Sequence, residues 1–348
     1  MDKAIILTGG MFATNYAKTA HGLVRSGERF EIVGVIDCNN GGLLAHEIVP
    51  LANPIKVFST PEAFFAENPG LATHCIVGVA TKGGKLPDDL KPQLIACMEQ
   101  GLHLVNGLHQ LLSDDTDIAA LARTKGLQIT DIRKPKSFKE LRFWDGSIEK
   151  VTSYKIAVLG TDCSVGKRTT SQFLVSCLRK EGVSAEMIYT GQTGWMQGSE
   201  YGFIFDATIN DFISGELEGA ILKCFYERHP RVMLIEGQSA LRNPSGPCGA
   251  EFILSASADA VILQIVPKRQ KFKGLEQYPA MMPSVADELK LLSYYGAPVM
   301  AITVNTEDMT SEEAFSFAEA LEKELNIPVV LPIEMGVGRL VRIIAMHL

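Results

Sequence analysis

Residues 160 to 170 read Gly160-Thr161-Asp162-Cys163-Ser164-Val165-Gly166-Lys167-Arg168-Thr169-Thr170. They follow an apolar, strand-like run and open a segment with helical periodicity. A glycine-rich turn in this position lets consecutive backbone N–H groups converge on an anion, and the helix start adds positive potential. Lys167 supplies a point charge to phosphate oxygens. The stretch predicts a phosphate-binding loop, with an ordinary glycine-rich turn as the alternative.

One position departs from the usual loop. Ser or Thr normally follows the Gly-Lys pair and ligates Mg²⁺, but Arg168 occupies that place here. Thr169 lies one residue later, turned by about 100° around the helix, and replaces the missing ligand only if the loop is shifted. Either Asp162 and an acid elsewhere hold the metal, or Arg168 itself neutralises the phosphates and no metal is needed.

Length and composition bound the class of protein. A chain of 348 residues favours two domains. Its net charge of −7 argues against a nucleic-acid or anionic-membrane surface, so we expect a small-molecule partner and no nucleic acid or membrane. The sequence has no run long enough to span a membrane and no signal-peptide pattern, which predicts a cytoplasmic protein. Its dispersed cysteines indicate neither a disulfide framework nor a zinc site, and a homo-oligomer is compatible with the sequence.

The first half alternates apolar strand-like runs with helical stretches. Strands are predicted at residues 4–8, 31–37, 74–80, 102–106 and 127–131, with helices at 12–25, 62–67, 91–100 and 117–125. This alternation is typical of a parallel sheet covered by helices. Gly9-Gly10 and Asp37 weakly suggest dinucleotide binding, but the G-x-G-x-x-G spacing is absent. We therefore predict an architectural Rossmann-like domain at 1–135.

A charge-mixed stretch at 136–153 reads as a linker, and a second alternating series follows at 154–348. Its strands are predicted at 155–159, 185–189, 232–235, 260–266, 298–304 and 328–331. The first of them leads into the phosphate loop. The predicted fold class is α/β, with two doubly wound parallel-sheet domains, the second resembling P-loop NTPases.

Ligands of such sheets collect beyond the carboxyl ends of the strands. After the strand at 185–189, hydroxyl, amide and indole groups stand among glycines and are candidate contacts for a small polar substrate; an exposed turn is the alternative. These are Thr190, Gln192, Thr193 and Trp195. Downstream cations are candidate clamps for a carboxylate or phosphate, or else isolated surface charges: Arg242, Lys268 and Arg269.

Acidic residues supply candidates for proton transfer and metal support. Asp206 and Asp211 precede a predicted helix that contains Glu216 and Glu218. Such carboxylates serve as a general base or support a metal, although Asp211 is equally a helix cap. Glu236 ends an apolar strand, as does the second motif of P-loop proteins, which supports Mg²⁺.

The loop from Gly160 to Lys167 resembles that of dethiobiotin synthetase and MinD-type P-loop proteins, and Glu236-Gly237 is similar to their strand end. The resemblance implies that Lys167 binds phosphates, that Asp162 and Glu236 support Mg²⁺, and that Asn305 contacts a base. The Thr ligand of those proteins is absent here.

The whole chain resembles a bacterial and archaeal family of formerly unknown function, some of whose members are assigned as D-glutamate N-acetyltransferases. The Gly-Lys-Arg-Thr-Thr run, residues 190–195 and residues 206–215 carry the resemblance. It implies acetyl transfer from acetyl-CoA to a D-amino acid. Asp206 or Asp211 then removes the ammonium proton, Arg242 or Lys268 pairs with the carboxylates, and the amides of residues 192–194 stabilise the oxyanion. The alternatives are an Mg-ATP-dependent ligase or kinase and a non-catalytic nucleotide switch.

Overall fold

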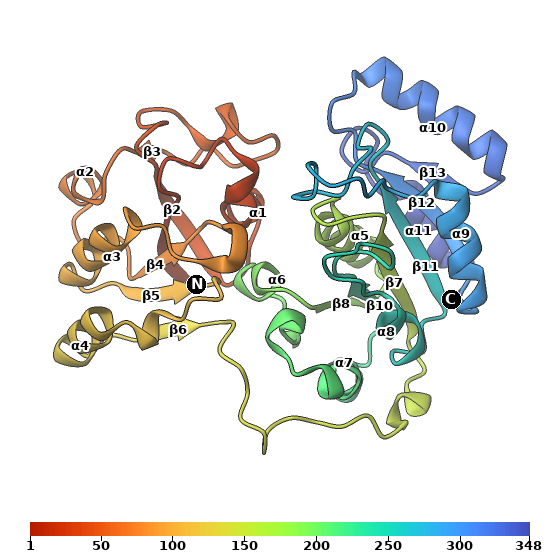
Figure 1. Ribbon diagram of the computed structural model, residues 1–348, viewed down its shortest axis with the longest axis horizontal. Coiled ribbons are helices and arrows are strands. Elements are labelled where there is room, and N and C mark those ends of the chain that lie inside the picture. Colours follow the sequence, from red (N-terminus) through yellow and green to blue (C-terminus); the bar gives the residue numbers. More distant parts are fainter. The chain divides into compact units, whose positions relative to one another are not determined.

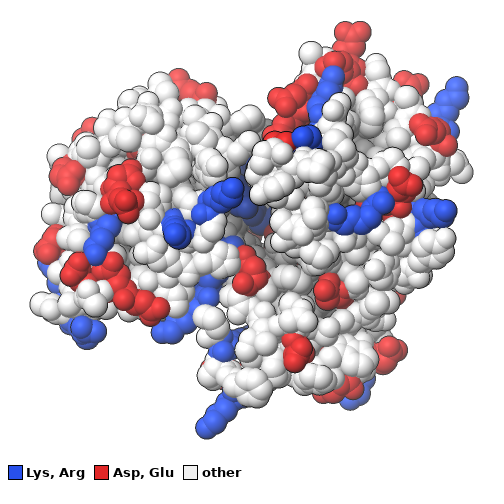
Figure 2. Space-filling view, in the orientation of Figure 1, with Lys and Arg blue, Asp and Glu red and all other residues white.

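The computed structural model describes residues 1–348 and divides into two compact units. The N-terminal unit comprises residues 1–136 together with 191–199, and the C-terminal unit comprises 137–190 together with 200–348 (Figure 1). None of the helices is both long enough and apolar enough to cross a bilayer. On the face drawn in Figure 2, acidic and basic side chains are interspersed among uncharged residues.

The N-terminal unit is built on a six-stranded parallel sheet of order β3-β2-β1-β4-β5-β6. Ile5 and Leu7 pack into one buried cluster and Ala4 and Ile6 into another, which shows that the sheet is buried on both faces. The strands are β1 (Asp2–Leu7), β2 (Phe30–Ile36), β3 (Val57–Phe58), β4 (His74–Val77), β5 (His103–Asn106) and β6 (Ile129–Asp131). The helices are α1 (Lys18–Arg25), α2 (Pro61–Glu67), α3 (Leu90–Glu99) and α4 (Thr116–Lys125).

Asp37, which follows β2, is buried and bonded to the protein itself. Its carboxylate accepts hydrogen bonds from Thr8 Oγ1 at 2.6 Å, from the Phe12 N–H at 2.9 Å and from Asn40 Nδ2 at 2.6 Å. These bonds fix the loop after β1 against the end of β2. The acid therefore has a structural role at the position where dinucleotide-binding domains hold a ribose.

The chain leaves the C-terminal unit after residue 190, folds with the N-terminal unit over residues 191–199 and then returns to the C-terminal unit. It forms α6 (Gln192–Met196), which the sequence had presented as a glycine-rich loop. Gln197 Nε2 donates to Gly22 O at 2.8 Å, and Arg29 donates to Trp195 O at 2.7 Å while its guanidinium lies 4.2 Å above the Trp195 ring. Met196 is fully buried in the same core. Tertiary packing therefore stabilises this helix, which has only five residues.

The C-terminal unit has a seven-stranded parallel sheet of order β13-β12-β11-β7-β10-β8-β9. The strands are β7 (Tyr154–Gly160), β8 (Ala185–Tyr189), β9 (Tyr201–Gly202), β10 (Val232–Glu236), β11 (Ala260–Ile265), β12 (Val299–Val304) and β13 (Val329–Val330). The helices are α5 (Lys167–Lys180), α7 (Ile213–Arg228), α8 (Ala250–Leu254), α9 (Val285–Tyr294), α10 (Ser311–Leu325) and α11 (Gly338–Ala345). Both sheets are parallel, which confirms the predicted α/β class.

The linker was predicted at 136–153; residues 137–153 of it belong to the C-terminal unit and pack against α7. Glu216 accepts the Arg142 N–H at 2.9 Å, and Glu218 accepts the Asp145 N–H at 3.1 Å and the Ile148 N–H at 3.0 Å. Both glutamates are buried, so these bonds satisfy their carboxylates. Glu216 and Glu218 therefore anchor the connecting segment to α7.

Candidate functional site: a phosphate-binding loop

The phosphate loop connects the end of β7 to the start of α5, next to the carboxyl ends of β10 and β11. The backbone of Gly166 is left-handed, with φ of 111°, and that of Ser164 has φ of 54°. A Cβ on Gly160 would lie 2.7 Å from Val165 Cγ2, so only glycine fits there. The Thr161 N–H donates to Gln264 O on β11 at 3.0 Å. The strand, loop and helix thus have the form that a phosphate loop requires.

Lys167, the first residue of α5, is buried beneath the loop. Its Nζ donates to Asp162 O at 2.8 Å and to Ser239 O at 2.7 Å, and burial lowers the pKa of the ammonium. The two acceptors are neutral carbonyls on the phosphate loop and on the loop after β10. The lysine is therefore held between two loops without a carboxylate hydrogen-bond partner, as suits a group that binds an anion.

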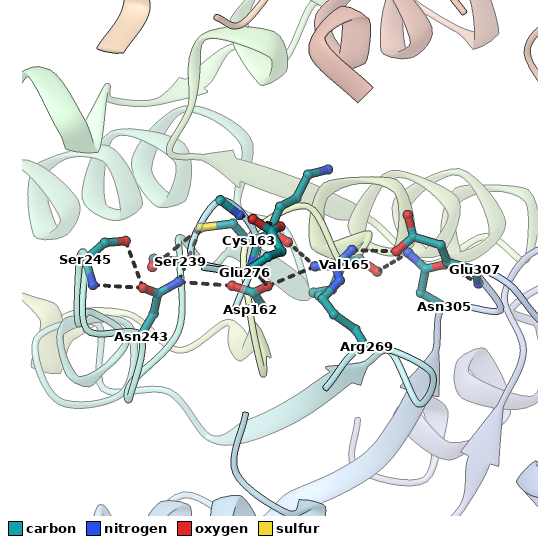
Figure 3. A network of polar contacts seen from close by, with 12 residues as sticks. Asp162, Cys163, Val165, Ser239, Asn243, Ser245, Arg269, Glu276, Asn305 and Glu307 are labelled. Carbon is teal, nitrogen blue, oxygen red and sulfur yellow. Dashed lines mark hydrogen bonds and ion pairs between the residues drawn. The ribbon is translucent and has the colours of Figure 1, made fainter. Parts of the chain in front are cut away.

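Asp162 lies at the centre of a polar network (Figure 3). Its side chain is fully buried and accepts hydrogen bonds from Asn243 Nδ2 at 3.0 Å, Arg269 Nη1 at 3.0 Å and the Lys273 N–H at 2.8 Å. Asn243 is fixed in turn by the N–H and hydroxyl of Ser245, both 2.9 Å from its Oδ1. Asp162 thus joins two segments of the C-terminal unit, one that follows β10 and one that follows β11, to the phosphate loop.

Arg269 braces the same loop from the other side. Besides Asp162 it donates to Cys163 O at 2.8 Å and to Glu307 Oε2 at 2.6 Å. Burial alone would lower its pKa, but the hydrogen bonds to Glu307 and Asp162 outweigh burial and raise the pKa. This arginine, predicted as a substrate clamp, is bonded to two carboxylates and a carbonyl of its own chain.

Two amides complete the support of the loop. Asn305, which the resemblance placed at a base, donates from Nδ2 to Val165 O at 3.1 Å and accepts the Glu307 N–H at 3.0 Å (Figure 3). Gln264 was not predicted: its Oε1 accepts the hydroxyls of Thr170 and Thr303, each at 2.7 Å. A buried glutamine within the apolar run of β11 was the available sequence signal.

Glu236 ends β10 and is buried beside the end of β8. One carboxylate oxygen accepts the Thr190 N–H at 3.0 Å, and the Thr190 hydroxyl donates to Glu236 O at 2.7 Å and accepts from Gln238 Nε2 at 2.9 Å. The structure therefore brings together Glu236 and Thr190, two of the predicted site residues.

Arg168 is half-buried, and its Nε is buried without a hydrogen-bond partner. Burial lowers the pKa of this guanidinium, and attraction from Glu236 partly opposes the effect. Thr161 Oγ1, at the start of the loop, is also buried and unpartnered. Buried polar atoms seldom lack partners, so two such atoms within this short loop indicate a place where a polar ligand binds.

The donors expected of an Mg²⁺ site do not fit that ion. A guanidinium occupies the usual hydroxyl position, and the Asp162 carboxylate already accepts three hydrogen bonds from donors of the chain. Glu236 already accepts a main-chain N–H, and no group of three or more His, Cys, Asp or Glu side chains is arranged around a common point. Of the two hydroxyls that follow Arg168, that of Thr170 is bonded to Gln264, and the one that is left, on Thr169, does not by itself make a magnesium site.

Other predicted site residues lie outside this network. Arg242 binds the buried Glu288 at 2.6 Å, and Lys268 pairs with the exposed Glu313 at 3.0 Å. Each of these two cations therefore has a carboxylate partner within the C-terminal unit.

Gln192, Thr193 and Trp195 fold with the N-terminal unit in α6, where the Thr193 hydroxyl lies 3.2 Å from that of Thr19. Asp206 and Asp211, the candidate bases, are both exposed. Asp206 lies near the end of β8, because the N–H of the neighbouring Phe205 donates to Thr190 O at 3.0 Å. Asp211 lies in the short turn that precedes α7.

Comparison with known proteins places this site in a family. A Rossmann-like domain of unknown function, DUF1611_N, matches residues 40–135, and the P-loop domain of unknown function DUF1611_C matches residues 142–341. A D-glutamate N-acetyltransferase of Tritonibacter scottomollicae is 32% identical over 279 residues, 79% of this chain and 81% of that protein. A second D-glutamate N-acetyltransferase, from a Pseudoalteromonas species, is 29% identical over 273 residues, 76% of this chain and 79% of that protein.

A solved structure has the same architecture. The crystal structure of a DUF1611 family protein from Anabaena variabilis is similar with a TM-score of 0.90 and 25% identity, covering 99% of this chain and 100% of that one. The matches to both domains, together with the relative that is 32% identical, show that this chain belongs to the DUF1611 family.

Proposed function

We propose that the protein transfers the acetyl group of acetyl-CoA to the amino group of D-glutamate or a related D-amino acid. Relatives that match more than three quarters of the chain are named for this reaction. The observation on this chain that supports the proposal is that Arg168 occupies the metal-ligand position of an otherwise complete phosphate loop. Coenzyme A has a pyrophosphate and a 3′-phosphate, which suit a loop that combines backbone N–H groups with cationic side chains.

Under this proposal the loop amides and Lys167 hold the phosphates of the donor. The substrate ammonium loses a proton, its nitrogen attacks the thioester carbonyl, the carbon–sulfur bond breaks and the CoA thiol leaves. Asp206 is the candidate for the base that takes the proton, because its carboxylate is exposed beyond β8, the strand that ends beside Glu236. Asp211 lies in the next short turn of the chain, just before α7. It is the control for Asp206 in the substitution experiment below.

ATP-dependent activation of a carboxylate is the alternative for a P-loop protein. It requires a metal to organise the phosphates, which the donors around this loop do not suit. A non-catalytic switch would bind a nucleotide but release neither CoA nor ADP.

One experiment separates the three. Purified protein is incubated with D-glutamate and either acetyl-CoA or Mg-ATP, and free CoA, ADP and N-acetylglutamate are quantified by liquid chromatography with mass spectrometry. We expect CoA and N-acetylglutamate in equal amounts, a large fall in rate for Asp206→Asn, and a rate near wild type for Asp211→Asn. Substrate-dependent ADP without CoA would replace the proposal with ligation, and neither product would replace it with the switch.

A further inference from the structure

We infer that this loop binds its polyphosphate without a divalent cation, and that Lys273, together with Arg168, supplies the positive charge that Mg²⁺ provides in other P-loop proteins. The inference rests on the proposed function only in requiring a phosphate-bearing ligand. It assigns a role to Lys273, which lies in no recognised motif, and it specifies the ligand class as a metal-free diphosphate ester.

Lys273 is attached directly to the phosphate loop. Its main-chain N–H donates to Asp162 Oδ2 at 2.8 Å, which fixes the backbone of residue 273 beside the loop. The same carboxylate oxygen accepts Arg269 Nη1 at 3.0 Å, so the two basic residues lie side by side. The long lysine side chain therefore begins at the loop, on the part of the chain between β11 and α9.

The side chain of Lys273 is half-buried and forms no ion pair. The neighbouring carboxylates, Asp162 and Glu307, are both bonded to Arg269. Burial and then repulsion from Arg269 lower the pKa of the Lys273 ammonium, while Glu307, Asp162 and Cys163 act in the opposite direction. Leaving a cation partly desolvated without a partner is unfavourable, and an anionic ligand on the loop would relieve that cost.

Arg168 supplies the second positive charge, at the start of α5. It occupies the position of the usual Mg²⁺ hydroxyl ligand, its Nε is buried and unpartnered, and the nearby Glu236 is the acid that would support the metal. A planar guanidinium donates to two phosphate oxygens at once. A dication brought between Arg168 and the loop would meet a fixed positive charge, so an Mg-nucleotide is disfavoured relative to a metal-free diphosphate.

The inference predicts how ligand affinity responds to metal and to substitution. CoA and ATP are titrated into the full-length protein by calorimetry, in excess EDTA and in excess MgCl₂. We expect CoA to bind with the same affinity in both buffers. Lys273→Met should weaken CoA binding by about 10-fold or more, as expected for a lost charge-assisted contact. Lys273→Arg should stay near wild type.

Lys271→Met is the matched control, since Lys271 lies on the same segment and its Nζ binds Glu276 O at 2.7 Å. It should leave the affinity unchanged. Arg168→Thr, which restores the usual hydroxyl, should weaken CoA binding in EDTA and make ATP binding respond to Mg²⁺. Thermal unfolding curves show which variants fold, and the wild-type comparison of the two buffers needs no variant.

Loss of wild-type CoA binding in EDTA would overturn the inference, as would equal affinities for Lys273→Met and Lys271→Met. The outcome is distinct from that of the proposed function. Metal-independent CoA binding without acetyl transfer would support the inference and refute the proposed acetyltransferase activity. Acetyl transfer together with CoA binding that requires Mg²⁺ would support the proposed activity and refute the inference.

Discussion

Replacing Asp162 by asparagine tests whether this acid braces the phosphate loop. Every group that its side chain contacts is a donor: Asn243 Nδ2 on one oxygen, and Arg269 Nη1 with the Lys273 N–H on the other. An asparagine in either orientation sets its own N–H₂ against one of these donors. The buried Arg269 guanidinium also loses the negative charge of Asp162. We expect the free energy of unfolding to fall by about 3 kcal/mol, and not by more, because Arg269 keeps its ion pair with Glu307.

Urea unfolding measures this cost in the C-terminal unit. Trp144 belongs to that unit and Trp195 to the other, so Trp195→Phe leaves Trp144 as the only tryptophan. With typical urea dependences, a loss of about 3 kcal/mol lowers the unfolding midpoint by about 1 M or more. Glu307→Gln is the control: its carboxylate is one-third exposed, at 34%, and its amide oxygen still accepts from Arg269, so we expect a loss below about 1 kcal/mol. A loss for Asp162→Asn no larger than that of the control would refute the bracing role.

Two further predictions concern packing and thiol chemistry. Gly215→Ala should destabilise the C-terminal unit by several kcal/mol, because a Cβ there would overlap the Arg142 carbonyl. At Gly219, one turn on, a Cβ would lie 3.0 Å from Cδ of the flexible Arg142 side chain, which can shift, so Gly219→Ala should cost far less because it also gains helix propensity. Thermal unfolding compares the two variants, and equal effects would contradict the packing. Burial, and secondarily the charge of Glu251, raises the pKa of Cys248 to about 12. Its alkylation, mapped by mass spectrometry, should therefore stay slow from pH 7 to 9 and slower than that of the exposed Cys38. The stability contributed by the protonated Cys248 thiol is lost only above pH 9, and fast labelling of Cys248 at pH 8 would contradict this.

Much of the fold was predictable because buried parallel strands are continuous apolar runs. The six strands predicted in the C-terminal half all form, and so do the five predicted in the N-terminal half. β3 and β9 were not predicted, since each is two residues long and lies in no longer run of buried apolar residues, whereas the equally short β13 belongs to the buried apolar run 329–331. α6 was also missed, because Gly191 and Gly194 favour a turn locally and contacts with the N-terminal unit decide the conformation.

The site was predictable where a local motif specifies it. Lys167, Arg168 and Glu236 were predicted as candidates from the loop and from the acid that ends β10. The bracing bonds were not, because they join distant positions: Arg269 meets Asp162 across 107 residues of sequence. Lys273 carries no local signal at all, and its place beside the loop depends on one main-chain bond to Asp162.

The account depends on residues 160 to 170 binding the phosphates of acetyl-CoA through Lys167. Calorimetric titration of acetyl-CoA into the wild-type protein and Lys167→Met tests this most directly. We expect saturable binding to the wild type and an affinity at least about 100-fold weaker in the variant, or about 2.7 kcal/mol, because a buried charge-assisted contact is lost. Equal affinities in the two proteins would contradict the account.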